Sequence, residues 1–272
     1  MTIRRAMMVA AAAGLLGMVA AVPASAQLGI PETPTPVPDG LAPSTGAPFP
    51  KGHYGALDAL PDWGGIWFAL FTPPAPGATP PPRPKLKGAY KDKYEAWRKE
   101  IAANHGVEKS ERSHCAPPGM PGIMQIPQYP FEFLFTPGRV TINQEAWMQT
   151  RRIWTDGRKH LDDPDPSYFG DSIGKWDGDT LVVDTIGIND ALPLTAGMPH
   201  SAKLHITERI HLKPGDPDTL VNEITVDDAD ALAEPFKTTV NYRRDRYGKL
   251  LEFECSENDR NPVDANGKTE FE

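Results

Sequence analysis

The sequence predicts a mainly β protein, in which an antiparallel up-and-down meander closes into a barrel or a strongly curved sheet with one docked amphipathic helix. Three observations lead to this prediction. Short strand-like segments alternate with turn signals over residues 131–255. One apolar stripe with helical spacing lies within residues 85–104. Of the 30 prolines, 15 lie between Gln27 and Pro84, where they disfavour regular structure.

The N-terminal segment has the features of a cleaved secretory signal. Two arginines precede an apolar run over residues 7–22, and a small-x-small motif ends at Ala26, directly before Gln27. The run is shorter than the roughly 20 residues that a membrane-spanning helix needs, and no later stretch is long and apolar enough to span. We therefore expect a periplasmic or secreted protein, cleaved between Ala26 and Gln27.

The proline content divides the rest of the chain. We expect a Pro-rich flexible spacer over residues 27–60, a single barrel-like domain over residues 61–256 and a polar tail over residues 257–272. The proline runs favour extended polyproline geometry, and a recognition ligand for a partner domain is the alternative to a simple spacer. Asp62–Phe71 is an apolar segment with strand character.

One helix is predicted at about residues 88–104. Its apolar residues recur at spacings of four, three and four, and they are Tyr90, Tyr94, Trp97 and Ile101. Three aromatic side chains on one stripe indicate docking onto a core. A lid over a pocket is the alternative.

The predicted strands are short and follow one another through hairpin signals such as Pro-Gly and Asp-Gly. They are Phe131–Thr136, Arg139–Gln144, Thr150–Trp154, Gly174–Trp176, Thr180–Ile188, Lys203–Leu212, Leu220–Val226, Lys237–Arg243 and Leu250–Cys255. Closure into a barrel is favoured because it removes the exposed edges of the sheet.

The charge balance and the cysteines limit the partners and the compartment. The chain has 28 basic and 36 acidic residues and a net charge of −8, which argues against nucleic acid as a partner. In an oxidising compartment, Cys115 and Cys255 are expected to form one disulfide between the entry to the strand region and its last strand. A reactive thiol beside His114 is the alternative.

The segment from Thr155 to Asp171 is rich in acidic residues and also contains Arg158, His160 and Tyr168. This segment has three possible interpretations: a calcium site, a solvated loop held by Asp–Arg contacts, or an acid or base that acts beside Arg158. We expect no metal, because the carboxylate spacing is not that of a calcium-binding loop. We assign proton transfer to Asp156 and anion stabilisation to Arg158.

The predicted strand Lys203–Leu212 has one polar face, which carries His205, Arg209 and His211. Because a cation lies between the two histidines, a metal site is disfavoured. The functional hypothesis is that His205 moves a proton and Arg209 stabilises an anion, and the alternative is a solvated face with ordinary cross-strand pairs. Glu208 interrupts the apolar face and therefore needs a buried partner, for which Arg151 and Arg152 are candidates.

Two resemblances add to this interpretation. Gly65-Ile66-Trp67 resembles the G-x-W motif that opens lipocalin-like barrels, which implies a basic side chain from a late strand against the tryptophan, with Arg243, Arg244 and Arg246 as candidates. The second covers most of the chain after the leader and rests on the blocks TDGR (155–158), GDSIGKWDGDTLVVDT (170–185), ER (208–209) and CSEN (255–258). It resembles a family of uncharacterised exported bacterial proteins and implies an envelope location.

Taken together, these observations predict an exported protein that binds a small, partly apolar or aromatic molecule. It is either a cofactor-free isomerase, lyase or hydratase, a non-catalytic periplasmic binder, or an envelope interaction module tethered by its Pro-rich segment. No cofactor is expected, since no Walker loop, G-x-G-x-x-G or G-x-S-x-G motif occurs. The expected ligand contacts are Trp154, Tyr168, Asp171, His211 and Glu223.

Overall fold

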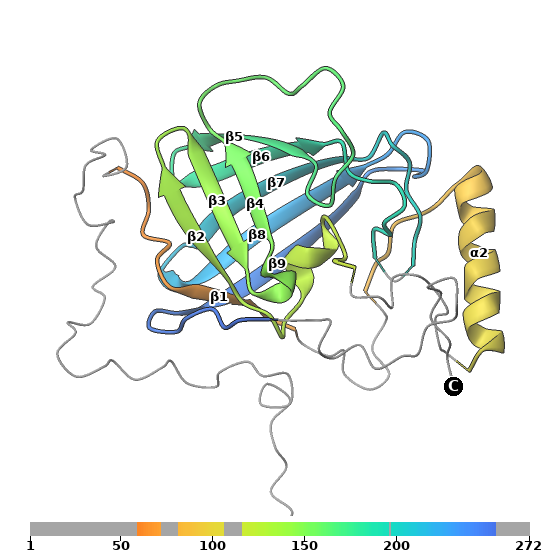
Figure 1. Ribbon diagram of the computed structural model, residues 1–272, viewed down its shortest axis with the longest axis horizontal. Helices are drawn as coiled ribbons and strands as arrows, with labels where there is room; N and C mark the ends of the chain where they lie inside the picture. Colours follow the sequence, from red (N-terminus) through yellow and green to blue (C-terminus); the bar gives the residue numbers. More distant parts are fainter. Residues whose placement is uncertain (1–58, 72–80, 106–115, 196, 254–272) are drawn as a thin grey trace, which may run out of the picture.

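The computed structural model describes residues 59–71, 81–105, 116–195 and 197–253, and within them nine strands close into one barrel (Figure 1). The elements are β1 (Ile66–Ala69), α2 (Gly88–Ala103), η3 (Gly122–Gln125), β2 (Phe131–Thr136), β3 (Arg139–Gln144), η4 (Ala146–Met148), β4 (Thr150–Trp154), β5 (Asp171–Asp177), β6 (Thr180–Ile186), β7 (His205–Lys213), β8 (Asp216–Asp227) and β9 (Phe236–Asp245). The predicted fold class, a mainly β barrel with a single helix, is confirmed.

The sheet is mixed because one pair of neighbouring strands is parallel. β4 and β5 pair in parallel through Ile153↔Ser172 and Trp154↔Ile173, whereas every other neighbouring pair is antiparallel. The expectation of a wholly antiparallel meander is therefore wrong at this point. The reason is the long connection over residues 155–170, which returns outside the barrel wall before β5 begins (Figure 1).

The strand boundaries follow the turn signals closely. Three strands, β2, β3 and β4, have the predicted bounds, and the ends of the others shift by up to four residues. The predicted last strand, Leu250–Cys255, is wrong over residues 250–253, which are not in a strand. The ring closes without it, because β1 already pairs with both β2 and β9. The ring of Phe253 instead packs 4.8 Å from that of Tyr129.

The G-x-W segment closes the barrel. Trp67 pairs with Arg244 across β1 and β9, and the guanidinium carbon lies 4.7 Å from the indole centroid. Arg244 is thus the basic partner that the motif leads one to expect. Gly65 has φ of 90°, and a Cβ there would lie 2.6 Å from the carbonyl oxygen of Asp245, so only glycine fits at this crossing.

The two ends of the barrel differ, and we name them by their contents. The tryptophan end holds Trp63, Trp176 and the β2–β3 hairpin, and the proline end holds the starts of β2 and β9 together with Pro81–Pro84. Trp63 is fully buried, with its ring 4.7 Å from that of Phe133. Between the ends the interior is filled by side chains that are almost completely buried, among them Phe131, Phe133, Ile142, Ile153, Leu181, Val183, Ile206, Ile210, Leu220, Ile224 and Tyr242.

Helix α2 lies beside the barrel rather than on its wall (Figure 1). Its aromatic stripe is half-buried, as the docking prediction requires, although no residue of the helix is fully buried. Trp97 packs so closely on Gly197 that a Cβ at that glycine would overlap the indole. The helix therefore docks on the loop that precedes β7. Among the described residues, no helix has the length and apolar character needed to cross a membrane.

Candidate functional site

The inward face of β7 decides between the two interpretations of its polar residues. Ile206, Glu208 and Ile210 are buried inside the barrel, whereas His205 and Arg209 are on the outer surface with 42% and 45% of their side chains exposed. The polar face is thus a solvated outer face, and it does not line the lumen. This follows from the strand period of two, which places Glu208 on the side opposite to His205 and Arg209.

Inside the barrel, Glu208 has the buried partner that its position requires. Arg151 from β4 forms a fully buried ion pair with it and also donates to Thr185 Oγ1 at 3.1 Å. Asn222 Nδ2 donates to Glu208 Oε1 at 2.8 Å, and Ser172 Oγ lies 3.4 Å from the guanidinium. Of the two candidate partners, Arg151 and Arg152, the structure selects Arg151. These five side chains come from five consecutive strands and bind one another, so this belt holds the interior together.

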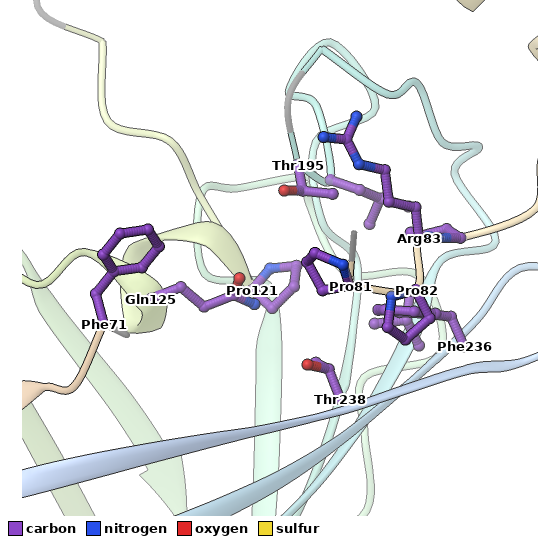
Figure 2. Close-up of a pocket in the computed structure, with 12 residues that line it drawn as sticks. Phe71, Pro81, Pro82, Arg83, Pro121, Gln125, Thr195, Phe236 and Thr238 are labelled. Atoms are coloured by element: carbon purple, nitrogen blue, oxygen red, sulfur yellow. The ribbon is translucent and has the colours of Figure 1, made fainter. Parts of the chain in front are cut away.

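A hollow lies at the proline end (Figure 2). We call it the proline pocket, and its volume is about 330 Å³. Its lining is Phe71, Pro81, Pro82, Arg83, Pro84, Pro121, Gln125, Leu194, Thr195, Val226, Phe236 and Thr238. These residues come from separate parts of the chain, so the pocket exists only in the folded protein.

The first wall of the proline pocket is the proline segment itself. Proline fixes an extended backbone without a donor, and the residues just after it are tied to the segment between β8 and β9. Leu86 forms a bridge with Leu232, Lys87 N donates to Ala231 O at 2.9 Å, and Ala233 N donates to Lys85 O at 2.8 Å. These bonds hold Pro81–Pro84 across the end of the barrel.

The second wall is η3 with the residues before it. Ile123 and Met124 of this short helix are buried in the core, and Met124 O accepts a hydrogen bond of 2.9 Å from Tyr242 Oη on β9. Burial raises the pKa of Tyr242 far above its usual range, so the phenol stays a donor. Because Met124 is fixed in this way, Pro121 and Gln125 are held at the pocket.

The third wall is the loop before β7, which carries Leu194 and Thr195 into the pocket. Ser201 N donates to Asp228 Oδ2 at 2.7 Å and thereby ties this loop to the segment just after β8. Burial opposes the charge on Asp228, but the hydrogen bonds that it accepts from Ser201 and neighbouring amides hold its pKa below the usual value. Beside it, burial lowers the pKa of His200, whose Nδ1 donates to Ser201 O at 2.8 Å.

The described lining of the proline pocket is mainly apolar, and its charge is positive. Eight of its twelve residues are Phe, Pro, Leu or Val, and Arg83 is the only charged residue among the described lining. Figure 2 shows Pro81 next to Pro121, with Thr195 and Thr238 on opposite sides of the two prolines. The arrangement offers apolar contact with a few hydrogen-bonding groups and one cation at the rim.

The predicted catalytic pair Asp156–Arg158 lies elsewhere, in an exposed turn after β4. Arg158 Nη2 donates to Asp156 Oδ2 at 2.6 Å, and this hydrogen bond lowers the pKa of Asp156 and raises that of Arg158. The guanidinium also lies 3.8 Å from the ring centroid of Trp154. The structure therefore joins three of the predicted site residues, but they do not line the proline pocket, and the carboxylate is already neutralised by its neighbour.

His205 belongs to a different cluster on the outer wall. Its Nε2 lies 2.8 Å from Asp184 Oδ2, while Asp184 Oδ1 lies 2.8 Å from Nε2 of His160. The other nitrogen of His160, Nδ1, lies 2.8 Å from Asp171 Oδ2. This cluster ties the return loop to β5, β6 and β7. It unites two predicted residues, His205 and Asp171, with two that the sequence reasoning left out of the site.

The remaining predicted site residues are spread over the surface. Arg209 Nη2 donates to Asp177 Oδ2 at 3.2 Å and its Nε lies 4.0 Å from Glu223, which makes an ordinary cross-strand arrangement. His211 Nδ1 donates to the carbonyl oxygen of Leu212, and Tyr168 is exposed. None of the four predicted residues lines the proline pocket; they are Arg209, Glu223, His211 and Tyr168.

Two further expectations concern cysteine and metal. Cys115 and Cys255 are outside the described residues, so their disulfide stays a prediction. Within the described ranges, no group of three His, Cys, Asp or Glu side chains is arranged to hold a metal ion.

Sequence reasoning missed the residues of the proline pocket and the two central members of the histidine cluster. A weak signal was present for the pocket, since Pro80–Pro84 directly precedes the helix and is too short to be a spacer. Nothing in the sequence places His160 beside Asp184, because their proximity depends on the path of the return loop.

The fold and the pocket together define a class: a closed, mixed β-barrel with a filled interior and a ligand-sized hollow at one mouth. No family model and no curated protein matches the chain.

Proposed function

We propose that the protein binds a small molecule with an apolar body and an anionic head in the proline pocket. The observation that carries the proposal is the lining: an apolar hollow of about 330 Å³ with Arg83 as its one described charge. This volume lies at the lower end of the range of small-molecule sites, about 300–1,000 Å³. A ligand carboxylate at the rim would lie near the positive charge of Arg83, although the chain as a whole has a net charge of −8.

The proposal is one of binding without catalysis. The side chains expected to transfer protons or stabilise an anion, Asp156, Arg158, His205 and Arg209, do not line the pocket. The walls are held by hydrogen bonds and buried side chains, which favours a preformed binding site. Of the functions considered from the sequence, a non-catalytic ligand-binding protein is therefore the one that we propose, with export through the predicted leader as its route to an envelope location.

The test is a calorimetric titration of the full chain with decanoate and with its neutral counterpart decanol. We expect Phe236→Ala to weaken both ligands about tenfold, and Arg83→Met to weaken decanoate about tenfold and decanol less than about twofold. Leu134→Ala and Arg152→Met are the matched controls, since both residues are exposed on the outer wall. Binding that is absent, or that is unchanged in Phe236→Ala, would overturn the proposal.

Export is tested separately by mass spectrometry of the protein recovered from the bacterial envelope. The expected mature chain begins at Gln27. A recovered chain that still begins at Met1 would contradict export through a cleaved leader.

A further inference from the structure

A second hollow lies at the opposite end of the barrel, against the β2–β3 hairpin. Its volume is about 190 Å³, and its lining includes Phe135, Arg139, Thr155 and Trp176. We call it the hairpin pocket. It shares no lining residue with the proline pocket, so the two can be tested independently.

One side of the hairpin pocket is aromatic and rigid. The ring centroids of Phe135 and Trp176 are 5.7 Å apart with their planes at 81°, and both rings pack on Trp63 at 5.7 and 5.4 Å. Trp63 is fully buried, so these rings are supported from within the barrel. Such a surface favours a flat ring, which can make edge-to-face or offset contacts with both aromatic side chains.

Arg139 brings an unused cation to the same pocket. Its Nε is buried without a hydrogen-bond partner, as are those of Arg151 and Arg244. Unlike those two arginines, Arg139 has no ion pair with a carboxylate within the described ranges. The other arginines with buried or half-buried side chains, Arg151, Arg244 and Arg246, each pair with an Asp or Glu. A buried donor without an acceptor costs free energy, and a ligand carboxylate would supply the acceptor.

The neighbouring residues keep this cation in place without neutralising it. The guanidinium carbon of Arg139 lies 5.7 Å from the ring centroid of Trp154, the residue opposite it on β4. Arg158 lies over the same ring, but its charge is matched by Asp156. Trp154 thus positions Arg139 through a cation–π contact, and the net charge left at this corner is positive.

We propose that the hairpin pocket binds a small aromatic carboxylate. The ring lies against Phe135 and Trp176, and the carboxylate accepts hydrogen bonds from the guanidinium of Arg139. The volume of the hairpin pocket indicates the size of the ligand. It is well below the volume of drug-sized sites, and the pocket has room for one ring with a short substituent.

The test uses benzoate, benzyl alcohol and cyclohexanecarboxylate, each titrated into the full chain by calorimetry. We expect benzoate to bind most tightly, since benzyl alcohol lacks the charge and cyclohexanecarboxylate lacks the aromatic face. Arg139→Gln is expected to weaken benzoate by about tenfold or more and benzyl alcohol by less than about twofold. Phe135→Leu is expected to weaken both. Arg152→Gln, on the outer wall of β4, is the matched control for loss of one positive charge.

Thermal melts of each variant establish that it is folded. Because Arg139 makes no ion pair with a described residue, its replacement by Gln is expected to leave the melting temperature nearly unchanged. Phe236→Ala, in the proline pocket, is expected to leave benzoate binding unchanged, which separates this site from the other. The proposal is overturned if benzoate does not bind at about 10 mM, a concentration at which even weak millimolar binding is detected, or if Arg139→Gln and wild type bind it equally.

Discussion

The two ends of the barrel are closed in different ways. At the tryptophan end, Trp63 enters the core and Arg244 joins Trp67 and Asp62, so the chain before β1 seals the sheet directly. At the proline end, loops and the segment Pro81–Pro84 cross the opening without filling it, and they leave the larger hollow. The strands are therefore responsible only for the barrel itself. The segments outside the sheet determine which side chains line each end of the barrel.

The interior separates the two mouths. The belt around Arg151 and Glu208 spans the barrel with paired charges, and apolar side chains fill the space on either side of it. A ligand at one end therefore has no path to the other. Four substitutions test the difference between the two ends.

The largest effect is expected from Glu208→Ala, which removes the belt that separates the ends. Arg151 would remain buried and unpaired, so we expect a loss of about 3–5 kcal/mol in the free energy of unfolding. Chemical denaturation measures it. Glu223→Ala, on the exposed face of β8, is the matched control with an expected change below about 0.5 kcal/mol. The double change Arg151→Met with Glu208→Leu is expected to restore most of the loss, and a double variant as unstable as the single one would contradict this account.

The next effect concerns closure at the tryptophan end. Gly65→Ala would bring a Cβ against the backbone of Asp245 at positive φ, and we expect a loss of about 2–3 kcal/mol. Gly178, in the β5–β6 turn, also has positive φ, but a Cβ added there would have nothing within 4 Å of it. Gly178→Ala is therefore expected to cost only about 1 kcal/mol. Equal losses in the two variants would show that the close approach at Gly65 is unimportant.

A third, pH-dependent effect belongs to the proline end. Burial lowers the pKa of His200, so as the pH falls the unfolded chain takes up a proton near pH 6.5 and the folded chain takes it up only at lower pH. Stability is therefore expected to fall as the pH drops below about 6.5, by up to about 1.4 kcal/mol per pH unit. His200→Gln is expected to flatten this slope between about pH 7 and pH 5 in denaturation experiments. Asp228, whose pKa is lowered, contributes a further loss only at more acidic pH.

The smallest effect is expected in the loop that runs between the ends. His160→Ala removes the contacts with Asp171 and Asp184 but no core side chain, so the change in global stability is expected to stay below about 1 kcal/mol. The local effect is larger. Hydrogen exchange at the amide of Leu161, which donates to Asp171 at 3.1 Å, is expected to speed up by about tenfold or more. Unchanged exchange there would mean that the histidine does not hold the loop.

Local sequence signals predicted the structure correctly where residues close together in the sequence also lie close together in the fold. Pro137-Gly138 fixes the hairpin between β2 and β3, and both strands have the predicted bounds. The strand period placed Glu208 on the apolar face of its strand, and its need for a buried partner narrowed the candidates to Arg151 and Arg152, of which Arg151 is the partner. Likewise, G-x-W pointed to a late basic residue, which is Arg244.

The rest depended on contacts that no local pattern records. The composition of residues 155–170 does not say whether the chain turns back at once or crosses the wall first, so the predicted direction of β5 was wrong. The proline pocket combines Pro81, Pro121, Leu194 and Phe236, which only the closed barrel brings together. The predicted catalytic residues had suitable side chains. Strand alternation, however, places His205 and Arg209 outside, while Asp156 lies in an exposed turn.

The parallel pair has a mechanical consequence. β4 and β5 meet through two residue pairs, and β1 and β2 also meet through two, whereas the other contacts between strands are longer. The barrel thus has two short strand pairings, β1–β2 and β4–β5. They separate a three-stranded unit, the flap (β2–β4), from a six-stranded unit, the wall (β5–β9 and β1). Arg151 on the flap is ion-paired with Glu208 on the wall, so one buried charge pair acts as the latch. Native-state hydrogen exchange is expected to show the flap opening as one unit when that latch is cut.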